Sequence, residues 1–127
     1  RKDRTEKCGE GKGMENIKIT GEEFPVDEVM DTCAKAAWLG KPSTRKFQSD
    51  DGKVQMLFEG TIYEPSYEEF SSDCNVFVVD EDGEKNPLYT IDSRSAGPYK
   101  KEVVTTGSKD DVREYILYND ITLKEVL

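Results

Sequence analysis

Residues 24–40, FPVDEVMDTCAKAAWLG, decide the fold class because they carry the clearest periodic pattern in the chain. Their apolar side chains recur every three or four residues, which is the spacing of one face of an α-helix. These side chains are Val26, Val29, Met30, Cys33, Ala34, Ala37 and Trp38. Pro25 suits the first turn, and Gly40 followed by Pro42 ends the helix. The pattern predicts an amphipathic helix whose apolar stripe, Trp38 included, lies in the core.

Strand-like composition and turn residues fill most of the remaining sequence. Residues 74–80 are apolar on both faces, as in a central strand, and apolar residues alternate over 54–58. Residues 61–65 either continue that strand or pair back on it after Gly60. The predicted strands cover residues 16–20, 45–49, 53–65, 74–80, 87–93 and 99–106.

The C-terminal region supports two interpretations. Ser108 is a suitable N-cap for a short helix over 109–118, although residues 113–120 also have strand composition. We adopt the helix here. The order of strand, helix and then further strands predicts an α+β fold: one amphipathic helix packed on an antiparallel sheet of four or five strands. We expect a flexible N-terminal arm at 1–15 and a single domain over 16–127.

Charge and composition restrict the function classes. The 127 residues contain 18 Lys and Arg against 27 Asp and Glu, a net charge of −9. Such a surface repels phosphate backbones, so RNA is disfavoured as a partner. No apolar run is long enough to span a membrane. The chain contains no histidine, which excludes Ser–His and Cys–His nucleophiles and argues against zinc. We expect a monomer without metal or cofactor.

The three cysteines allow at most one intrachain disulfide. Cys33 falls on the apolar stripe of the predicted helix and is expected to be a buried free thiol. This leaves Cys8 and Cys74 as the candidate bridge, which would suit an oxidising compartment. Three reduced thiols in a cytosolic protein are the alternative. The opening RKDRTEKCGEGKG is typical of a mature N-terminus left by processing, and a trimmed chain would read the same.

An ordered series of segments is similar to a known family. The segments are Cys8, FPVDEVMDTCAKAA (24–37), TRKFQSDDG (44–52), VQMLFEGTIYEPSYEEF (54–70), NVFVVDEDG (75–83) and LYTIDSRSAGPYKKEVV (88–104). In this order they resemble the small guanyl-specific ribonucleases secreted by fungi, and more closely the ribonuclease-like secreted effectors of plant-pathogenic fungi of the powdery-mildew type. The aromatic-x-cysteine start of those effectors is missing, and residues 105–127 have no counterpart.

The resemblance implies a ribonuclease-like fold and a role in virulence. It implies a secreted, non-enzymatic effector that is translocated into the host cell and binds a host protein or RNA there. It also implies that a plant immune receptor can recognise the protein, as happens with avirulence effectors.

The catalytic positions of the ribonucleases are altered in this chain. The family uses a glutamate or histidine base, an arginine and a histidine acid. The matching positions here fall near Glu68 or Glu69 for the base, Asn75 for the arginine, and Asp92 or Ser93 for the acid. As an acid at pH 7, Asp92 would need its pKa raised by about three units, ~4 kcal/mol. Arg94 nearby would oppose that shift. We therefore interpret Glu69, Asp92 and Arg94 as vestigial.

Exposed aromatic residues and loops are the expected contact sites. The candidate binding residues are Tyr63, Tyr67, Phe70, Tyr89, Arg94 and Tyr99, and the candidate loops are 41–44, 64–73 and 93–99. Ordinary packing between strands is the alternative role of the aromatic residues. One alternative function is a carboxylate-based hydrolase or residual nuclease, although adjacent acids are common by chance in so acidic a chain. Another is a cystatin-like inhibitor or binding module, although the Gln-x-Val-x-Gly motif is absent.

Overall fold

The computed structural model describes residues 17–127, which form seven strands and two helices. The elements are β1 (Lys18–Ile19), α1 (Val26–Trp38), β2 (Thr44–Ser49), β3 (Gln55–Ser66), β4 (Glu69–Val79), β5 (Lys85–Gly97), β6 (Lys100–Gly107), α2 (Lys109–Tyr118) and β7 (Leu123–Val126). The predicted flexible arm at 1–15 lies outside these residues. Among the described residues, neither helix has the length and apolar character that a membrane span requires.

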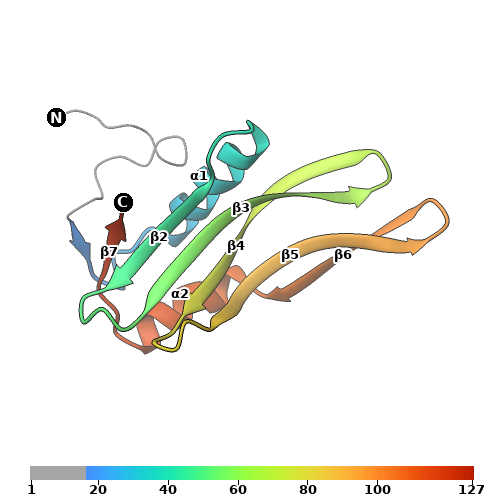
Figure 1. Ribbon diagram of the computed structural model, residues 1–127. Coiled ribbons are helices and arrows are strands. Elements are labelled where there is room, and N and C mark those ends of the chain that lie inside the picture. The colour runs from blue at the N-terminus through green and yellow to red at the C-terminus, as the bar shows by residue number, and fades with distance from the viewer. Residues whose placement is uncertain (1–16) are drawn as a thin grey trace.

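All the strands described form one antiparallel sheet with the order β1-β7-β2-β3-β4-β5-β6 (Figure 1). The prediction of a single helix on four or five strands is therefore wrong. The C-terminal chain returns across the molecule and inserts β7 between β1 and β2, after forming a second helix. Non-local pairing of this kind leaves no periodic signal in a strand as short as β7.

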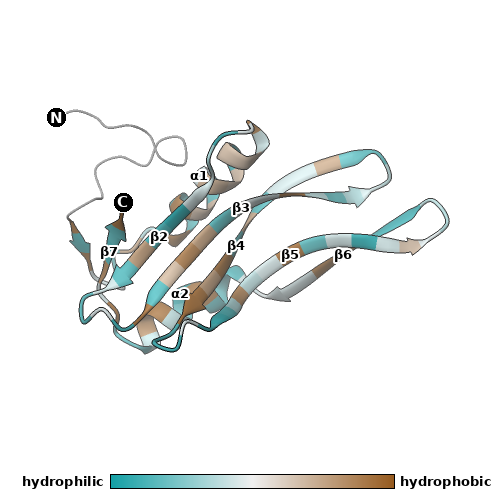
Figure 2. Cartoon of the chain, viewed as in Figure 1, coloured by the Kyte–Doolittle hydropathy of each residue, from teal (hydrophilic) through white to brown (hydrophobic). Residues whose placement is uncertain are grey.

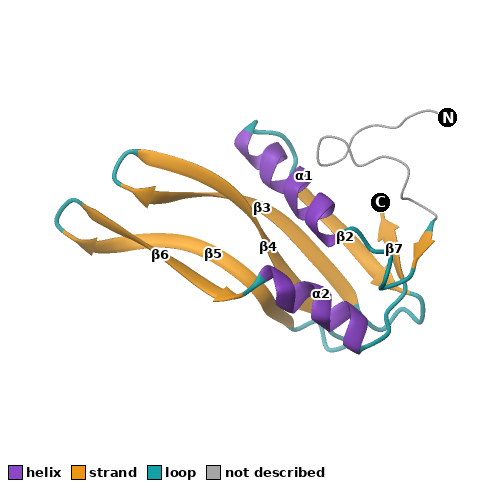
Figure 3. Cartoon of the chain, turned by 180° about the vertical axis from the view of Figure 1, so that it is seen from behind, coloured by secondary structure: helices purple, strands orange, loops and turns teal. Residues whose placement is uncertain are grey.

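Both helices cover the same face of the sheet, as the view from behind shows (Figure 3). Their buried residues join those of the sheet in one apolar core. At its centre, Phe47 of β2 makes edge contacts with Phe24, at 4.9 Å between ring centroids, and with Phe58 of β3, at 5.5 Å. Apolar residues concentrate in the part of the sheet beside the helices (Figure 2). The far ends of β3, β4, β5 and β6 are more polar.

Helix α1 begins and ends close to where the sequence predicts. Gly40, with a φ of 72°, closes the C-terminus: its N–H donates to Ala37 O at 3.1 Å, and the N–H of Lys41 donates to Ala36 O at 2.9 Å. Glycine adopts this left-handed conformation without strain. The prediction of a buried Trp38 is wrong, because the buried stripe ends at Ala36 and Trp38 is 54% exposed.

Gly60 allows α1 to approach the sheet closely. A β-carbon built on Gly60 would lie 2.1 Å from the backbone oxygen of Cys33 in the helix. Only glycine fits such a contact. The N–H of Gly60 also donates to Ser43 O at 2.9 Å. Of the two interpretations of residues 61–65, the structure confirms the continuous one, because β3 passes through Gly60 and runs on to Ser66.

Helix α2 has the bounds that the sequence predicts. Ser108 and Asp111 form a capping box: Asp111 N donates to Ser108 Oγ at 3.1 Å, and Ser108 N donates to Asp111 Oδ2 at 2.9 Å. The two reciprocal bonds satisfy backbone donors at the helix start. Val112 and Ile116 are the buried residues of α2, and Tyr115 packs against the same core.

A buried ion pair fixes β7 in the sheet. Arg45 of β2 donates from Nε to Glu125 Oε2 at 2.9 Å and from Nη2 to Glu125 Oε1 at 2.8 Å. Both side chains are at least 98% buried. Arg45 Nη1 also donates to Thr32 Oγ1 of α1 at 3.4 Å. A bidentate pair of this geometry sets the register of β7 and joins it to the helix layer.

Cys33 and Cys74 are both buried and form no disulfide with each other or with another described residue. Cys33 Sγ lies 4.0 Å from Phe58 O, and Cys74 Sγ lies 3.5 Å from Asn75 O. The predicted burial of Cys33 is confirmed. Cys8 lies outside the described residues, so the Cys8–Cys74 bridge stays a prediction.

Candidate functional site

Two long hairpins extend beyond the helices as arms (Figures 1 and 3). The first arm is residues 61–73, the distal part of β3 and β4 with their turn. The second arm is residues 92–104, the distal part of β5 and β6 with theirs. The predicted loops 64–73 and 93–99 are mostly paired strand and form the ends of these arms.

The arms separate because the β4–β5 ladder stops early. The last paired residues in the direction of the arms are Val76 and Tyr89. Just beyond this pair, Ile91 N of β5 donates to the side chain of Asn75 in β4, at 2.9 Å from Oδ1, in place of a backbone carbonyl of β4. One polar side chain thus accepts the hydrogen bond of a backbone N–H in β5 at the point where the two arms diverge.

Tyr89 and Asp73 form a hydrogen bond at the base of the two arms. Tyr89 is buried and donates its hydroxyl to Asp73 Oδ2 at 2.8 Å. Lys109 Nζ of α2 lies 3.4 Å from Asp73 Oδ1. Burial first, and then the hydrogen bond to Asp73, raises the pKa of Tyr89 well above its ordinary value. The phenol therefore stays protonated and acts as a donor through the physiological range.

Further out, the two arms contact each other. Glu64 N of the first arm donates to Ser93 Oγ of the second at 3.0 Å. Lys101 Nζ lies 2.9 Å from Glu64 Oε1. At the ends, the rings of Tyr67 and Tyr99 meet edge to face with centroids 6.1 Å apart. These contacts hold the two tips beside one another.

The turns at the tips place aromatic side chains in solvent. Tyr67, Phe70 and Tyr99 are 56%, 57% and 83% exposed. Tyr99 has a φ of 58°, and Glu68 in the other turn has a φ of 65°. Both are left-handed conformations, which cost residues other than glycine roughly 1–2 kcal/mol. We call Tyr67, Phe70 and Tyr99 the tip aromatics.

The residues predicted as vestigial acid–base groups are spread over both arms. Glu69 accepts a short hydrogen bond from Ser66 within the first turn. Asp92 is exposed on β5, and its Oδ1 accepts from Ser93 N at 2.8 Å. Arg94 pairs across the second arm with Glu102, at 3.1 Å between Nη2 and Oε2. Each of these groups is therefore engaged by a near neighbour on its own hairpin.

The predicted binding residues divide into two groups. The tip aromatics are exposed, whereas Tyr89 is buried and Tyr63 is partly buried against the core. Arg94 is exposed on the second arm. Sequence reasoning assigned Trp38 to the core and gave no role to Tyr118, which are 54% and 89% exposed. Their position in the last turn of each helix, next to the cap, is the signal that could have indicated exposure.

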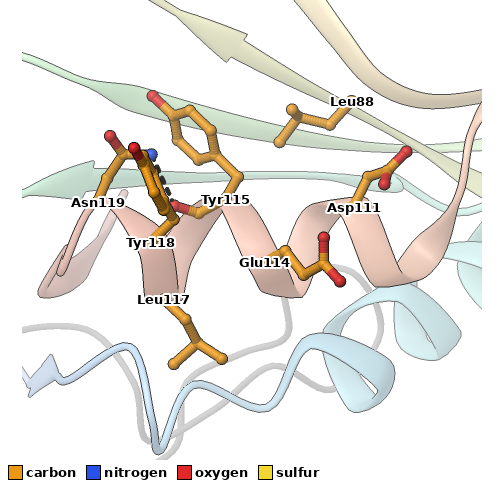
Figure 4. Close-up of a pocket in the computed structure, with 7 residues that line it drawn as sticks. All are labelled: Leu88, Asp111, Glu114, Tyr115, Leu117, Tyr118 and Asn119. Atoms are coloured by element: carbon orange, nitrogen blue, oxygen red, sulfur yellow. Dashed lines mark hydrogen bonds between the residues drawn. The ribbon is translucent and has the colours of Figure 1, made fainter.

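A groove of about 530 Å³ follows α2 (Figure 4). Its lining residues are Leu88, Asp111, Glu114, Tyr115, Leu117, Tyr118 and Asn119. Burial, together with the charge of Asp80, raises the pKa of Tyr115. The polar groups here are partly used within the helix: Asp111 caps it, and Asn119 Nδ2 donates to Tyr115 O at 2.8 Å. The groove thus offers an apolar surface with few free polar groups.

Comparison with known protein families, with curated proteins and with solved structures gave no match to this chain. Within residues 17–127, no cluster of three or more cysteine or carboxylate side chains has the arrangement of a metal site.

Proposed function

We propose that this chain is a non-catalytic protein-binding module whose arm tips contact the partner. The observation that carries the proposal is Tyr99. Its φ of 58° is unfavourable for any residue with a β-carbon, and its ring is 83% exposed. Neither backbone preference nor core packing explains a tyrosine there. Exposed aromatic rings of this kind anchor protein interfaces.

The surroundings of Tyr99 support the same conclusion. The ring is positioned by Tyr67, and the arms are joined by Glu64 with Ser93 and Lys101. A contact surface that is held before binding loses less conformational entropy when the partner arrives. Two hairpins tied to each other therefore present the tip aromatics as one surface.

The state of the acid–base positions supports binding over catalysis. The chain has no histidine. Asp92 is exposed, so it lacks the burial that an acid role would require, and Arg94 is engaged by Glu102. The alternative is a carboxylate-based hydrolase or residual nuclease that uses Glu69 and Asp92, and it predicts turnover of RNA or polysaccharide.

A protein is the partner that the charge favours. Three glutamates, Glu64, Glu68 and Glu69, lie on the first arm beside the tip aromatics. They oppose the approach of a phosphate backbone, and so does the net charge of −9. The resemblance to secreted fungal effectors adds a location and a kind of partner to the proposal: secretion, entry into a plant cell, and a host protein or immune receptor. Those additions do not depend on the prediction of a ribonuclease-like fold, which the structure contradicts.

The test is capture of a binding protein from plant extract by the tagged full chain, followed by a titration with the purified partner. The double variant Tyr67→Ser, Tyr99→Ser should lose at least tenfold in affinity, since one interface aromatic contributes about 1–2 kcal/mol or more. Tyr118→Ser is the matched control, because this residue is 89% exposed and belongs to α2, which is not part of either arm. Equal binding by all three proteins would contradict the proposal.

The enzymatic alternative is tested with RNA and with polysaccharide at neutral pH. The proposal expects no turnover above that of a heat-treated sample. Turnover that disappears in Glu69→Gln or in Asp92→Asn would overturn it.

A further inference from the structure

We infer that the outer edge of β6 binds an extended, acidic segment of the partner protein as an additional β-strand. This inference rests on the proposed function, because it specifies how the partner of the arm tips is held. Strand β6 is the last in the sheet order, so no described strand pairs with its outer edge. In an antiparallel ladder alternate residues direct their N–H and C=O groups away from the partner strand, which leaves about four such residues in β6.

Two other edges of the sheet are protected against strand addition, whereas β6 is not. Strand β1 at the opposite edge has two residues. The β5–β6 ladder begins at Tyr89, so residues 85–88 of β5 also form an edge, and Pro87 removes a donor there. Short edges and prolines are common devices against strand addition. The eight residues of β6, KKEVVTTG, contain no proline and pair without a bulge from Val103 to Gly107.

The side chains of β6 define the chemistry of the added strand. The β5–β6 hairpin, Lys85–Gly107, contains four basic and two acidic side chains, a formal charge of +2 in a chain of −9. Lys100 and Lys101 lie at the end of β6 next to Tyr99. Val103 and Val104, 39% and 36% exposed, follow on opposite faces. Opposite charges and β-branched pairs stabilise neighbouring strands. Because Lys101 is already paired with Glu64, the complement is a segment with acids near Lys100 and β-branched residues near the valines.

Charge argues against a second copy of this chain as the occupant. Two copies would each bring a net charge of −9 and would repel each other. Eight residues from each copy also fall short of the roughly 1,200 Å² that stable interfaces bury. A partner that also contacts the tip aromatics buries more surface.

The test uses a capped octapeptide alternating Glu with Val and Thr as the probe, and amide hydrogen exchange of the full chain as the readout. The inference expects the peptide to slow exchange of the outward amides of β6 several-fold. Lys100→Glu should weaken binding about fivefold, since one cross-strand charge pair contributes up to about 1 kcal/mol. Lys124→Glu on β7, at the other side of the sheet, is the matched control and should not change the affinity.

Three outcomes would overturn the inference. The first is unchanged exchange in β6 at saturating peptide. The second is equal binding by a peptide whose backbone is N-methylated at every residue, because such a peptide cannot join a ladder. The third is a dimer by light scattering that protects β6 without peptide. The variant Tyr67→Ser, Tyr99→Ser should still bind the peptide, so failure of strand addition is distinguishable from failure of the tip contact.

Discussion

Replacing Glu125 with glutamine is expected to lower the free energy of unfolding by about 3–5 kcal/mol. The change keeps the size of the side chain but leaves the guanidinium of Arg45, at least 98% buried, without its bidentate carboxylate. Removing one partner of a buried ion pair typically costs this much, because the remaining charge has lost its solvation. The loss is about a fifth or more of the stability of an ordinary domain.

Urea unfolding followed by circular dichroism measures the effect. With a slope of about 1.5 kcal/mol per M, the midpoint should fall by about 2–3 M. Asp27→Asn is the control, because it breaks an exposed ion pair with Arg113, 2.9 Å long, and should cost less than about 0.5 kcal/mol. The double variant Arg45→Met, Glu125→Met should recover most of the loss, since apolar replacement of a buried pair is often neutral. A cost for Glu125→Gln as small as that of Asp27→Asn would refute the reasoning.

Three further changes test other parts of the structure. Gly60→Ala should cost about 3 kcal/mol in urea unfolding, because its β-carbon would lie 2.1 Å from Cys33 O, a backbone atom that cannot move alone; a cost below 1 kcal/mol would contradict the close approach of α1. Tyr89→Phe should cost about 1 kcal/mol at pH 7 through loss of the bond to Asp73. In the unchanged protein the pKa of Tyr89 is higher in the folded state than in the unfolded state, where the phenol ionises near pH 10. The free energy of unfolding should therefore fall as the pH rises above 10. Tyr89→Phe should reduce that fall, because it removes the ionising group. Ser108→Ala should cost about 1 kcal/mol and speed amide exchange in the first turn of α2; unchanged exchange there would contradict the capping box.

Local signals predicted the helices well. The apolar spacing and Gly40 set the bounds of α1, and the cap at Ser108 set the start of α2. Signals of this kind depend on residues within one or two turns of each other, so a single sequence contains them. Trp38 was misassigned because periodicity gives the direction of a side chain and not how far along the helix the buried stripe continues.

The sheet could be predicted only in part. Strand β7 was missed because its buried face carries Glu125, which reads as a surface residue until Arg45, eighty positions earlier in the chain, is brought beside it. The ends of β3 and β5 were assigned to loops since their residues are polar, and the arms have little core to cover. Their strand structure comes from pairing within each hairpin.

The candidate site was predicted in the same uneven way. The tip aromatics stand out as aromatic residues in polar, turn-like sequence, and the structure confirms their exposure. Tyr89 has a similar local sequence but is buried, because its hydroxyl finds Asp73 on the neighbouring strand. Alternation along a strand does not reveal such a partner.

The most direct test of the account is amide hydrogen exchange of the full chain with and without its captured partner protein. The account predicts that exchange slows at residues 66–70 and 98–107, in the turns of the two arms and along β6, and stays unchanged in α2. Protection centred on residues 109–118 and the groove of Figure 4, with both arms unaffected, would contradict it.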